Sequence, residues 1–521
     1  MNFLNFFLLS ASFIHSSHQY NYLVFCPLFA HSHHVFLAKI ADTLTDAVHN
    51  VTFLAPIIFK KYENVKYLKS TKDLVLVQPS DELAKFSVVG NYSKFWTHDA
   101  SAIQFAPAIR GYMKMFYQMN EDFKNNLTVL DELKNREFDA MIFQFMSYTA
   151  YPIADYLNIK TLLPVLSLTH EVTLSRWIGE PASPSFLPGT ITPYGDDMTF
   201  WERLHNTMTE LFYKTFVPPE PMYSFKEPRR VIDVEGMTRR APFVFLNANP
   251  YLDYPRALLT KSVWIGGITV NTTQIREQKM PRDFEEILEK REQTVLISFG
   301  SQIMAKDMPW SYKQTLFSVI GSFPKVTFIW KYEDEDFEEL ENLHIFKWVP
   351  QTTLLADPRL TAFITHAGLG SVQELSYLGK PAILIPVFGD QMRNSRTLAR
   401  HNGAIVLSKY DLSDFQKVKS AVERILSEES YAKNAEILAQ HLHDQPISPQ
   451  QLLVRHAAFG AKYGELKTLD PSSRSMSWFS FYMIDIILVI VVLVGLLGSM
   501  IGVMVRWVAR KLCGRNKVKV Q

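Results

Sequence analysis

The sequence predicts an α/β protein with two doubly wound parallel sheets that face each other across a cleft, followed by one membrane-spanning helix. Three observations lead to this prediction. Short, continuously apolar runs alternate with segments of helical periodicity, as expected when crossover helices bury strands on both faces. This alternation occurs in two successive series along the 521 residues. Near the C-terminus, twenty consecutive residues carry no charge, which is about the length that crosses a bilayer.

The first series begins with an apolar run at 22–26. Apolar side chains then recur at helical spacing between 37 and 47, and a second strand is expected at 51–55. This order is that of a β-α-β unit. Another buried strand is expected at 140–145. Residues 165–235 are rich in proline and aromatic side chains, and we expect an irregular loop region over a pocket there.

The second series predicts strands at 294–298, 326–331, 362–365, 382–385 and 404–407, with helices at 309–321 and 371–378 among them. Ligands of such sheets bind beyond the carboxyl ends of the strands. We therefore expect two domains that share a ligand cleft, an N-terminal domain at 18–265 and a C-terminal domain at 266–470.

Both ends of the chain indicate targeting to a membrane. Residues 1–17 are expected to be a signal peptide, because their apolar run is too short to span a bilayer of about 30 Å. Residues 486–505 are expected to span it. All six cations of the tail at 506–521 follow the span, so the positive-inside rule predicts a type I protein with a cytosolic tail. The rest of the chain has a net charge of −4, which argues against a nucleic-acid partner.

Further signals fit a lumenal body. Four sequons for glycosylation occur, at Asn50, Asn91, Asn126 and Asn271. Cys26 is the one cysteine of the body, so no internal disulfide is expected. The chain ends in Lys517-Val-Lys519-Val-Gln521, which resembles a retrieval signal of the endoplasmic reticulum. The alternative is a basic patch that holds anionic lipid.

The second series contains the motifs that indicate a ligand. A Gly300-Ser301 turn follows the strand at 294–298, and His366-Ala-Gly368-Leu-Gly370-Ser371 follows the strand at 362–365. Glycines after a strand allow close approach of a ligand, and the next helix offers free N–H groups and its dipole to a diphosphate. His366 can donate a further hydrogen bond. The pattern predicts a phosphate site.

Two more side chains complete a nucleotide site. Glu374 lies about two helical turns beyond the glycines, where its carboxylate can accept both hydroxyls of a ribose. Trp348, in Trp348-Val-Pro-Gln351, offers an aromatic face to a base. The sequence therefore predicts that the second domain binds a nucleoside diphosphate.

Together these spacings match the donor motif of the UDP-glycosyltransferases, and nearly the whole chain resembles animal UDP-glucuronosyltransferases. The resemblance implies the GT-B arrangement of two Rossmann-like domains. It implies a donor site with Trp348 on uracil, Gln351 and Glu374 near the ribose, Ser301, His366, Gly368, Gly370 and Ser371 near the diphosphate, and Asp390 and Gln391 on the sugar hydroxyls. Many vertebrate members have Asn in place of Gly370, so one phosphate donor is missing here.

The resemblance also implies a catalytic base in the N-terminal domain, which would bind the acceptor. The family base belongs to a Ser-His pair sixteen residues before a second histidine, and Ser32-His33 and His49 match that spacing. His33 also follows the strand at 22–26, at the expected cleft. The cluster of His31, His33 and His34 could instead hold a metal. No acid or cysteine stands beside it, and a structural surface role is expected for His31 and His34.

The implied reaction is direct displacement with inversion. The acceptor hydroxyl passes its proton to His33 and attacks the anomeric carbon, while His366 and helix N–H groups stabilise the departing UDP, so no metal or other cofactor is required. A metal-dependent alternative is the Asp-x-Asp within residues 333–336. That acidic run is better interpreted as the solvated start of a helix.

One position departs from the family in a way that bears on activity. Phe138-Asp139 and the strand that follows align without a gap, and the acid that ends this strand in the family is Gln144 here. Glutamine can accept a hydrogen bond from His33, but it cannot stabilise an imidazolium with a full charge. Asp139 lies about 17 Å away along an extended strand and cannot substitute.

Three functions follow from these observations. The first is a lumenal hexosyltransferase of the endoplasmic reticulum, which conjugates glucuronate or glucose from its UDP form to a hydroxyl of a small lipophilic acceptor, as in detoxification. The second is an impaired member that binds UDP-sugar and modulates active relatives as a homo- or hetero-oligomer. The third is an anchored carrier of hydrophobic ligands, suggested only by residues 165–235. The donor-side residues favour the first two.

Overall fold

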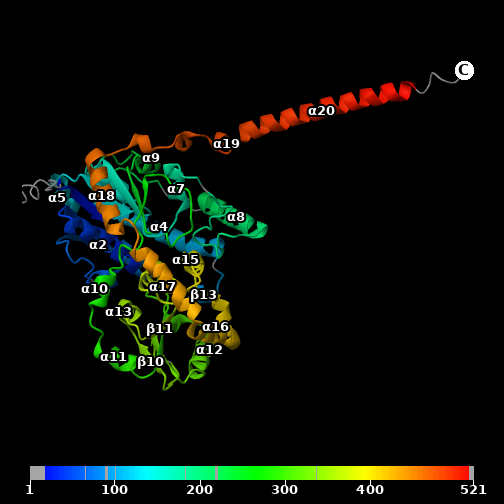
Figure 1. Cartoon of the computed structure of the whole chain (residues 1–521). Helices are drawn as coiled ribbons and strands as arrows, with labels where there is room; N and C mark the ends of the chain where they lie inside the picture. The colour runs from blue at the N-terminus through cyan, green and yellow to red at the C-terminus, as the bar shows by residue number, and fades with distance from the viewer. Residues whose placement is uncertain are drawn as a thin grey trace, which may run out of the picture. The chain divides into compact units, whose positions relative to one another are not determined.

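The computed structural model describes residues 18–515, apart from 65, 89–91, 100, 182, 217–220 and 336. The expected signal peptide, the sequon at Asn91 and residues 516–521 of the basic tail therefore lie outside the described residues. The chain divides into two compact units, Met1–Leu469 and Asp470–Gln521. Figure 1 shows the sheets and helices of the first unit.

The first sheet occupies the N-terminal half of the first unit. Within the described residues it has seven strands, β1 (Asn21–Phe25), β2 (Asn50–Pro56), β3 (Asp73–Val77), β4 (Ala140–Gln144), β5 (Thr161–Leu166), β6 (Val244–Leu246) and β7 (Ser262–Trp264). Their order is β3-β2-β1-β4-β5-β6-β7, and all neighbours are parallel. The order reverses between β1 and β4, which makes this pair the switch point where ligands bind.

The second sheet repeats this design. Over the described part of the chain it has six parallel strands, β8 (Gln293–Ser298), β9 (Val326–Lys331), β10 (Leu343–Phe346), β11 (Leu360–Thr365), β12 (Ala382–Leu384) and β13 (Ala404–Val406). Their order is β10-β9-β8-β11-β12-β13, so the switch point lies between β8 and β11. The prediction of two doubly wound parallel sheets is confirmed.

Helices cover the two sheets, as right-handed crossovers between parallel strands require. The longer ones in the first unit are α2 (His31–Asp46), α4 (Ala102–Asn125), α6 (Ala150–Tyr156), α7 (Val172–Ile178), α8 (Phe200–Phe216), α11 (Arg282–Leu288), α12 (Trp310–Gly321), α14 (Leu369–Leu378), α15 (Gln391–Ala399), α16 (Phe415–Ser427), α17 (Glu429–His443) and α18 (Pro449–Tyr463). Shorter ones are α3 (Asp81–Ala84), α5 (Thr128–Leu133), α9 (Val234–Arg239), α10 (Thr272–Arg276) and α13 (Gln351–Ala356). The last helix of the unit, α18, returns to the first sheet and packs against α2, β5 and β7.

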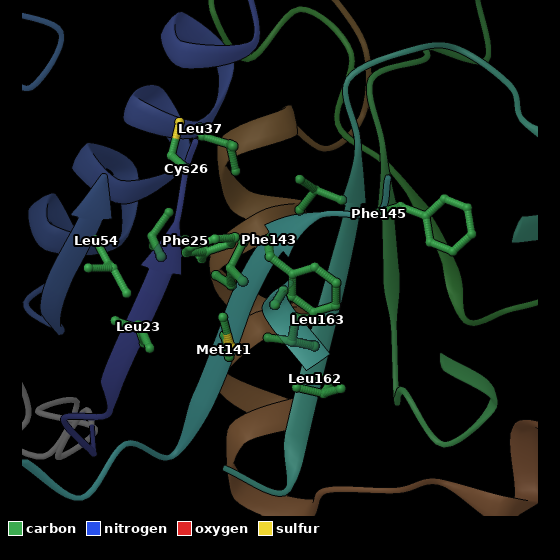
Figure 2. Close-up of a cluster of buried hydrophobic side chains, with 14 of the residues drawn as sticks. Leu23, Phe25, Cys26, Leu37, Leu54, Met141, Phe143, Phe145, Leu162 and Leu163 are labelled. Atoms are coloured by element: carbon green, nitrogen blue, oxygen red, sulfur yellow. The ribbon is translucent and has the colours of Figure 1, made fainter. Parts of the chain in front are cut away.

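The core of the first sheet explains why its strands read as continuous apolar runs. All residues of β4 and β5, and those of β1 from Tyr22 to Phe25, are buried, and helices cover both faces of the sheet. Figure 2 shows Phe25, Met141, Phe143 and Leu163 packed together in this core. Cys26 is also buried there as a free thiol, and burial raises the pKa of that thiol.

The expectation of an irregular region at 165–235 is wrong for its central part, where α8 forms a helix. Thr199 and Glu202 form a capping box before it, with the Thr199 N–H donating to Glu202 at 2.8 Å and the Glu202 N–H donating to the Thr199 hydroxyl at 3.4 Å. Asn206, on the buried side of α8, accepts from the Gly189 N–H at 2.8 Å. The helix thereby holds the preceding loop in place.

A short segment of the first half, residues 93–99, inserts into the core of the second sheet, and we call it the strap. Trp96 is fully buried among that core, with its ring 5.2 Å from the ring of Phe299. Its indole N–H donates to the Met304 carbonyl at 3.3 Å. The Lys409 ammonium donates to the Phe95 carbonyl at 2.6 Å. The strap therefore ties the two halves of the first unit together.

The buried indole of Trp96 yields a stability prediction. Trp96→Phe keeps an aromatic ring but removes the N–H donor and leaves a small void, so we expect a loss of about 1–2 kcal/mol. Thermal unfolding of the detergent-solubilised chain would measure it. Trp201→Phe is the matched control, because Trp201 is 73% exposed. Equal unfolding temperatures for the two variants would contradict the role of the strap.

The second unit contains α19 (Trp478–Phe481) and the long helix α20 (Ile484–Arg515). Within α20, residues Ile484–Leu512 are long and apolar enough to cross a membrane, by length and composition alone. This stretch contains the span expected at 486–505.

Candidate functional site

Both switch points open into one cavity of about 800 Å³. Its walls contain residues that follow β1, β4, β8 and β11, as expected for ligand sites of doubly wound sheets. The predicted donor residues and the predicted base all line it, namely His33, Gln144, Ser301, Trp348, Gln351, His366, Gly368, Gly370, Ser371, Glu374, Asp390 and Gln391. Residues from both halves of the first unit thus meet in one space.

His366 lies between two glycines at the centre of the nucleotide side. A Cβ at Gly300 would approach the His366 ring to 2.6 Å, and one at Gly368 would approach it equally closely. Gly300 also has φ of +83°, a conformation that side chains disfavour. Burial, with Lys331 nearby, lowers the pKa of His366 to about 4, so the ring is neutral at pH 7 and can donate one hydrogen bond.

Glu374 and Gln351 form a connected pair beside the first turn of α14. The Gln351 amide donates to the Glu374 carboxylate at 2.6 Å and to the Ser371 hydroxyl at 3.1 Å. Burial raises the pKa of Glu374 to about 7, while the Gln351 bond opposes that rise. Trp348 is 64% exposed, so its ring is available to stack with a planar ligand.

Gly370 occupies open space in the first turn of α14. A Cβ at this position would meet no atom within 4 Å. Packing therefore leaves room for a side chain at position 370.

Lys331 is a cavity residue that sequence reasoning missed. Its ammonium donates to the Gly300 carbonyl at 3.0 Å, pairs with Glu333 at 2.6 Å and lies 5.7 Å from the centre of the Trp348 ring. Its position at the carboxyl end of a buried strand is the sequence signal by which it could have been identified as a site residue. The acidic run after it does not start a helix, because Glu333 pairs with Lys331 and accepts from the Ala305 N–H at 2.9 Å.

Metal ligands do not gather in the described part of the chain, where no group of three or more histidine, cysteine or acidic side chains is found. Asp336, the second acid of the Asp-x-Asp, lies outside the described residues.

Asp390 and Gln391 lie at the start of α15, beyond the end of β12. The Asp390 carboxylate accepts from the Asn394 amide at 2.7 Å. The Gln391 oxygen accepts from the N–H groups of Val387 and Phe388 at 2.9 and 3.1 Å. These bonds fix both side chains and leave the Gln391 NH₂ group as a donor for the cavity.

His33 lies in the first turn of α2, with its ring 4.9 Å from the ring of Phe29. Burial lowers the pKa of His33 to about 4. The side chain is partly exposed to the cavity, yet its Nδ1 is enclosed and bonds to none of the described residues. The ring is therefore a neutral acceptor without a fixed tautomer.

His31 and His34 lie near His33 in the sequence, and a structural role at the surface was expected for both. His34 is fully buried, and its Nε2 accepts from the Ala30 N–H at 3.1 Å. That bond fixes the turn into α2, so the expectation of a surface position is wrong for His34. His31 is partly buried, with its ring 5.6 Å from that of Tyr67.

Gln144 ends β4 and has 1% of its surface exposed. Its oxygen accepts from the hydroxyl of Ser167 and from the Ser167 N–H at 3.3 Å. Its amide nitrogen bonds to none of the described residues. Because a backbone N–H can only donate, the oxygen must face Ser167, and the NH₂ group is left over. Asp139 instead accepts from the Asn21 N–H at the opposite end of the sheet, so it cannot reach His33.

The wall of the cavity around His33 is largely apolar. Aromatic and aliphatic side chains from α2, α4, the ends of β4 and β5 and the adjoining loops form it, among them Phe29, Phe36, Ile109, Tyr112, Met113, Phe116, Phe145, Met146, Tyr148, Leu168 and Ile191. Such a wall suits a lipophilic ligand.

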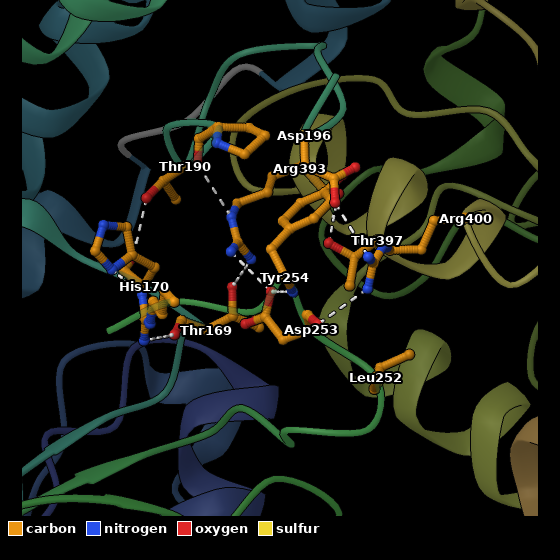
Figure 3. A network of polar contacts seen from close by, with 12 residues as sticks. Thr169, His170, Thr190, Asp196, Leu252, Asp253, Tyr254, Arg393, Thr397 and Arg400 are labelled. Atoms are coloured by element: carbon orange, nitrogen blue, oxygen red, sulfur yellow. Dashed lines mark hydrogen bonds and ion pairs between the residues drawn. The ribbon is translucent and has the colours of Figure 1, made fainter. Parts of the chain in front are cut away.

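A buried polar network lies behind the cavity (Figure 3). Arg393, from α15, pairs with Asp253 at 2.7 Å and donates to the Thr169 hydroxyl at 2.5 Å. Both partners of the ion pair are almost completely buried. Arg256 donates to the Thr169 carbonyl at 3.1 Å and contacts His170. Sequence reasoning missed this network, because its members are distant in the chain and form no motif.

Comparisons with known proteins agree with this geometry. The sequence profile of the family described as UDP-glucoronosyl and UDP-glucosyl transferase matches residues 23–519. The chain is similar to human UDP-glucuronosyltransferase 1A6, with 24% identity over 88% of this chain and 86% of the relative.

Solved structures show the same fold. A UDP-glucose:anthocyanidin 3-O-glucosyltransferase in complex with UDP superposes with a TM-score of 0.59 and 15% identity over 85% of this chain and 98% of its own. A UDP-glucosyltransferase from Polygonum tinctorium that glucosylates indoxyl gives a TM-score of 0.55 and 14% identity over 86% and 99%. At these identities the likeness shows the fold alone, which is that of GT-B glycosyltransferases.

Proposed function

The chain belongs to the family of UDP-glucuronosyl and UDP-glucosyl transferases, and from that premise we propose that it transfers a hexosyl group from a UDP-sugar to a hydroxyl of a small lipophilic acceptor, with inversion. One observation carries the proposal. A single cavity contains the nucleotide-side residues of the second sheet, the partly exposed His33 of the first sheet and an apolar wall beside it. Donor and acceptor would therefore meet there.

The chain's own residues would divide the work as follows. His33 accepts the proton of the acceptor hydroxyl as its oxygen attacks the anomeric carbon. His366 and the first N–H groups of α14 donate to the diphosphate as negative charge develops on UDP. Glu374 and Gln351 hold the ribose, Trp348 holds uracil, and Asp390 and Gln391 hold the sugar. No step requires a metal.

A second candidate function is favoured by the orientation of Gln144. If its NH₂ group faces the ring of His33, the histidine must accept at Nδ1, and its proton then sits on Nε2. That tautomer cannot take a proton from an acceptor. An impaired family member that binds UDP-sugar and modulates active relatives in an oligomer is the corresponding proposal.

We place the protein in the endoplasmic reticulum membrane as a single-pass type I protein with a lumenal body. The apolar stretch of α20 at 486–505 and the basic residues that follow this stretch support the placement. Asn50, Asn126 and Asn271 are exposed, as glycosylation would require.

The experiment that tests the proposal is titration of the detergent-solubilised chain with UDP, followed by measurement of UDP release with phenols and steroids. Binding with release supports the transferase. Binding without release for any acceptor supports the impaired member. Absence of UDP binding would refute both and leave the carrier of hydrophobic ligands.

A further inference from the structure

The two residues assigned to the donor sugar, Asp390 and Gln391, belong to one loop after β12, residues 387–391. The side-chain oxygen of Gln391 accepts from the N–H groups of Val387 and Phe388, so the loop is bonded to its own backbone. Its residues from Phe388 to Gln391 all line the cavity. A displacement of this backbone would therefore move the groups that are proposed to hold the sugar.

The strap contacts this loop from outside the cavity. The ring of Phe95 stacks on the ring of Phe388, with the ring centres 4.7 Å apart and the planes at 18° to each other. Phe388 lines the cavity, whereas Phe95 does not. A residue from the first half of the unit thus supports a wall residue of the second half through an aromatic contact.

Lys409 joins the strap to the loop by hydrogen bonds. Its side chain is almost completely buried beyond the end of β13. The ammonium donates to the carbonyls of Phe95 at 2.6 Å and Val387 at 3.1 Å, and also to the His98 carbonyl. An ammonium has three N–H donors, and here two of the acceptors belong to the strap and one to the loop. Burial lowers the pKa of Lys409 to about 8, so the group is still a charged donor at pH 7.

The strap also leads into the acceptor side of the cavity. Its last residue, Asp99, accepts from the Tyr410 hydroxyl at 2.6 Å, and α4 begins three residues later at Ala102. The helix α4 contributes four residues to the apolar wall, namely Ile109, Tyr112, Met113 and Phe116. Two successive parts of the chain, the strap and α4, therefore contact the loop 387–391 and form part of the acceptor wall.

We propose that Lys409 and Phe95 are positioning residues, which hold the loop 387–391 against the first half of the unit so that Asp390 and Gln391 reach the sugar of the donor. The proposal rests on the function proposed above and adds to it two side chains that do not line the cavity. The nucleotide side is built from other segments, at the ends of β8 and β11 and on α14. Loss of the strap contacts should therefore affect binding of the sugar and not binding of the nucleotide.

The variant Lys409→Met tests the proposal, because it keeps the apolar stem of the side chain and removes its three donors. UDP, UDP-glucose and UDP-glucuronate would be titrated into the full chain in detergent, and the UDP-sugar that wild type binds more tightly would serve as the sugar probe. We expect its affinity to fall about tenfold while the Kd of UDP changes less than about twofold. The single-turnover rate with a phenol at saturating UDP-sugar should fall about 10- to 100-fold.

Lys417→Met, in α16, is the matched control, because it makes the same change at a side chain that is 59% exposed. It should leave both affinities and the rate unchanged. An equal fall in the affinities of Lys409→Met for UDP and for the UDP-sugar would show that Lys409 only stabilises the fold, and would overturn the proposal. Unchanged affinities for both ligands would overturn it as well.

If Lys409→Met does not fold, Phe95→Leu replaces it, since this variant removes the stacked ring and keeps the backbone carbonyl that Lys409 bonds. The ratio of the Kd of the UDP-sugar to the Kd of UDP should rise about threefold or more, and an unchanged ratio would contradict the proposal equally. If wild type binds neither UDP nor a UDP-sugar, the proposed function itself fails. That result is distinct from an unchanged ratio in a chain that binds both.

Discussion

Replacing His33 with alanine is expected to lower turnover by about 10²–10⁴-fold, the usual contribution of a general base. His33 lies at the switch point of the first sheet and is partly exposed to the cavity. Its low pKa keeps the ring neutral at pH 7. Single-turnover rates with UDP-sugar and a phenol would measure the loss. His31→Ala, next in the same cluster, is the control, and it should retain most of the activity.

The companion variant is Gln144→Asp, which is expected to raise turnover by roughly 10- to 150-fold without altering UDP affinity. Ser167 can donate its hydroxyl and N–H to one carboxylate oxygen as it does to the amide, which leaves the second oxygen for His33. A carboxylate beside imidazole favours the charged ring, so it should raise the pKa of His33 from about 4. The acid limb of the pH–rate profile should therefore move to higher pH.

The double variant, Gln144→Asp combined with His33→Ala, tests whether the carboxylate acts through His33. Gln144→Asp should rescue nothing when His33 is alanine, because the carboxylate acts only through the histidine. If Gln144→Asp is no faster than wild type while His33→Ala is inactive, another residue orients His33 and the missing-acid explanation is wrong.

Replacing Glu374 with alanine should weaken UDP binding about 30- to 150-fold, since two hydroxyl contacts to a carboxylate are worth roughly 2–3 kcal/mol. The loss should be larger than the direct contacts suggest if Gln351 also moves, because Gln351 is held by Glu374 at 2.6 Å. Calorimetric titration with UDP measures the effect. An unchanged Kd would contradict the assignment of the nucleotide site. Glu341→Ala is a suitable control, because the Glu341 side chain is 96% exposed.

The carboxyl group of Glu374 also predicts that the affinity for UDP depends on pH. Its pKa is raised to about 7 in the folded protein, so the group is protonated below that pH and ionised above it. Ribose hydroxyls donate to the ionised form, and UDP affinity should therefore rise as pH increases through about 7. Glu374→Gln should remove this rise while retaining the titration of the diphosphate itself. An identical pH profile in both proteins would show that Glu374 does not titrate in the site.

The sequence predicts several buried strands closely, but it did not predict β5 or β6, although every residue of both strands is buried. β9 agrees at both ends with the strand expected at 326–331, and β8 and β12 differ by one residue at one end. An edge strand is harder, because one side lies in solvent. β3 was missed, and its Leu74 and Leu76 are 46% and 41% exposed. Its four apolar residues form a short continuous run, but Leu74 and Leu76 are exposed while Val75 and Val77 are only partly buried.

The helix α8 was not predicted from the sequence for a different reason. Aromatic residues along it suggested an irregular region, although Thr199 and Glu202 had the spacing of a capping box. Several of its large apolar side chains are exposed, including Trp201 and Met208. Local composition therefore obscured a helix whose start signal was present in the sequence.

The candidate site was predictable because residues at strand ends converge at the switch point of a parallel sheet. What the sequence does not contain is pairing between distant residues. Arg393 and Asp253 are separated by more than a hundred residues, and Trp96 inserts into a core built from the other half of the unit. Neither contact has a local periodicity or spacing by which it could be recognised.

The most direct test of the central claim, that this one cavity transfers a sugar, is the anomeric configuration of the product. The chain would be incubated with an α-linked UDP-sugar and a phenolic acceptor, and the product examined by proton NMR. We expect a β-linked conjugate formed in equal amount with UDP, and none from His33→Ala. An α-linked conjugate, or an equal yield of the conjugate from His33→Ala, would contradict direct displacement with His33 as the base.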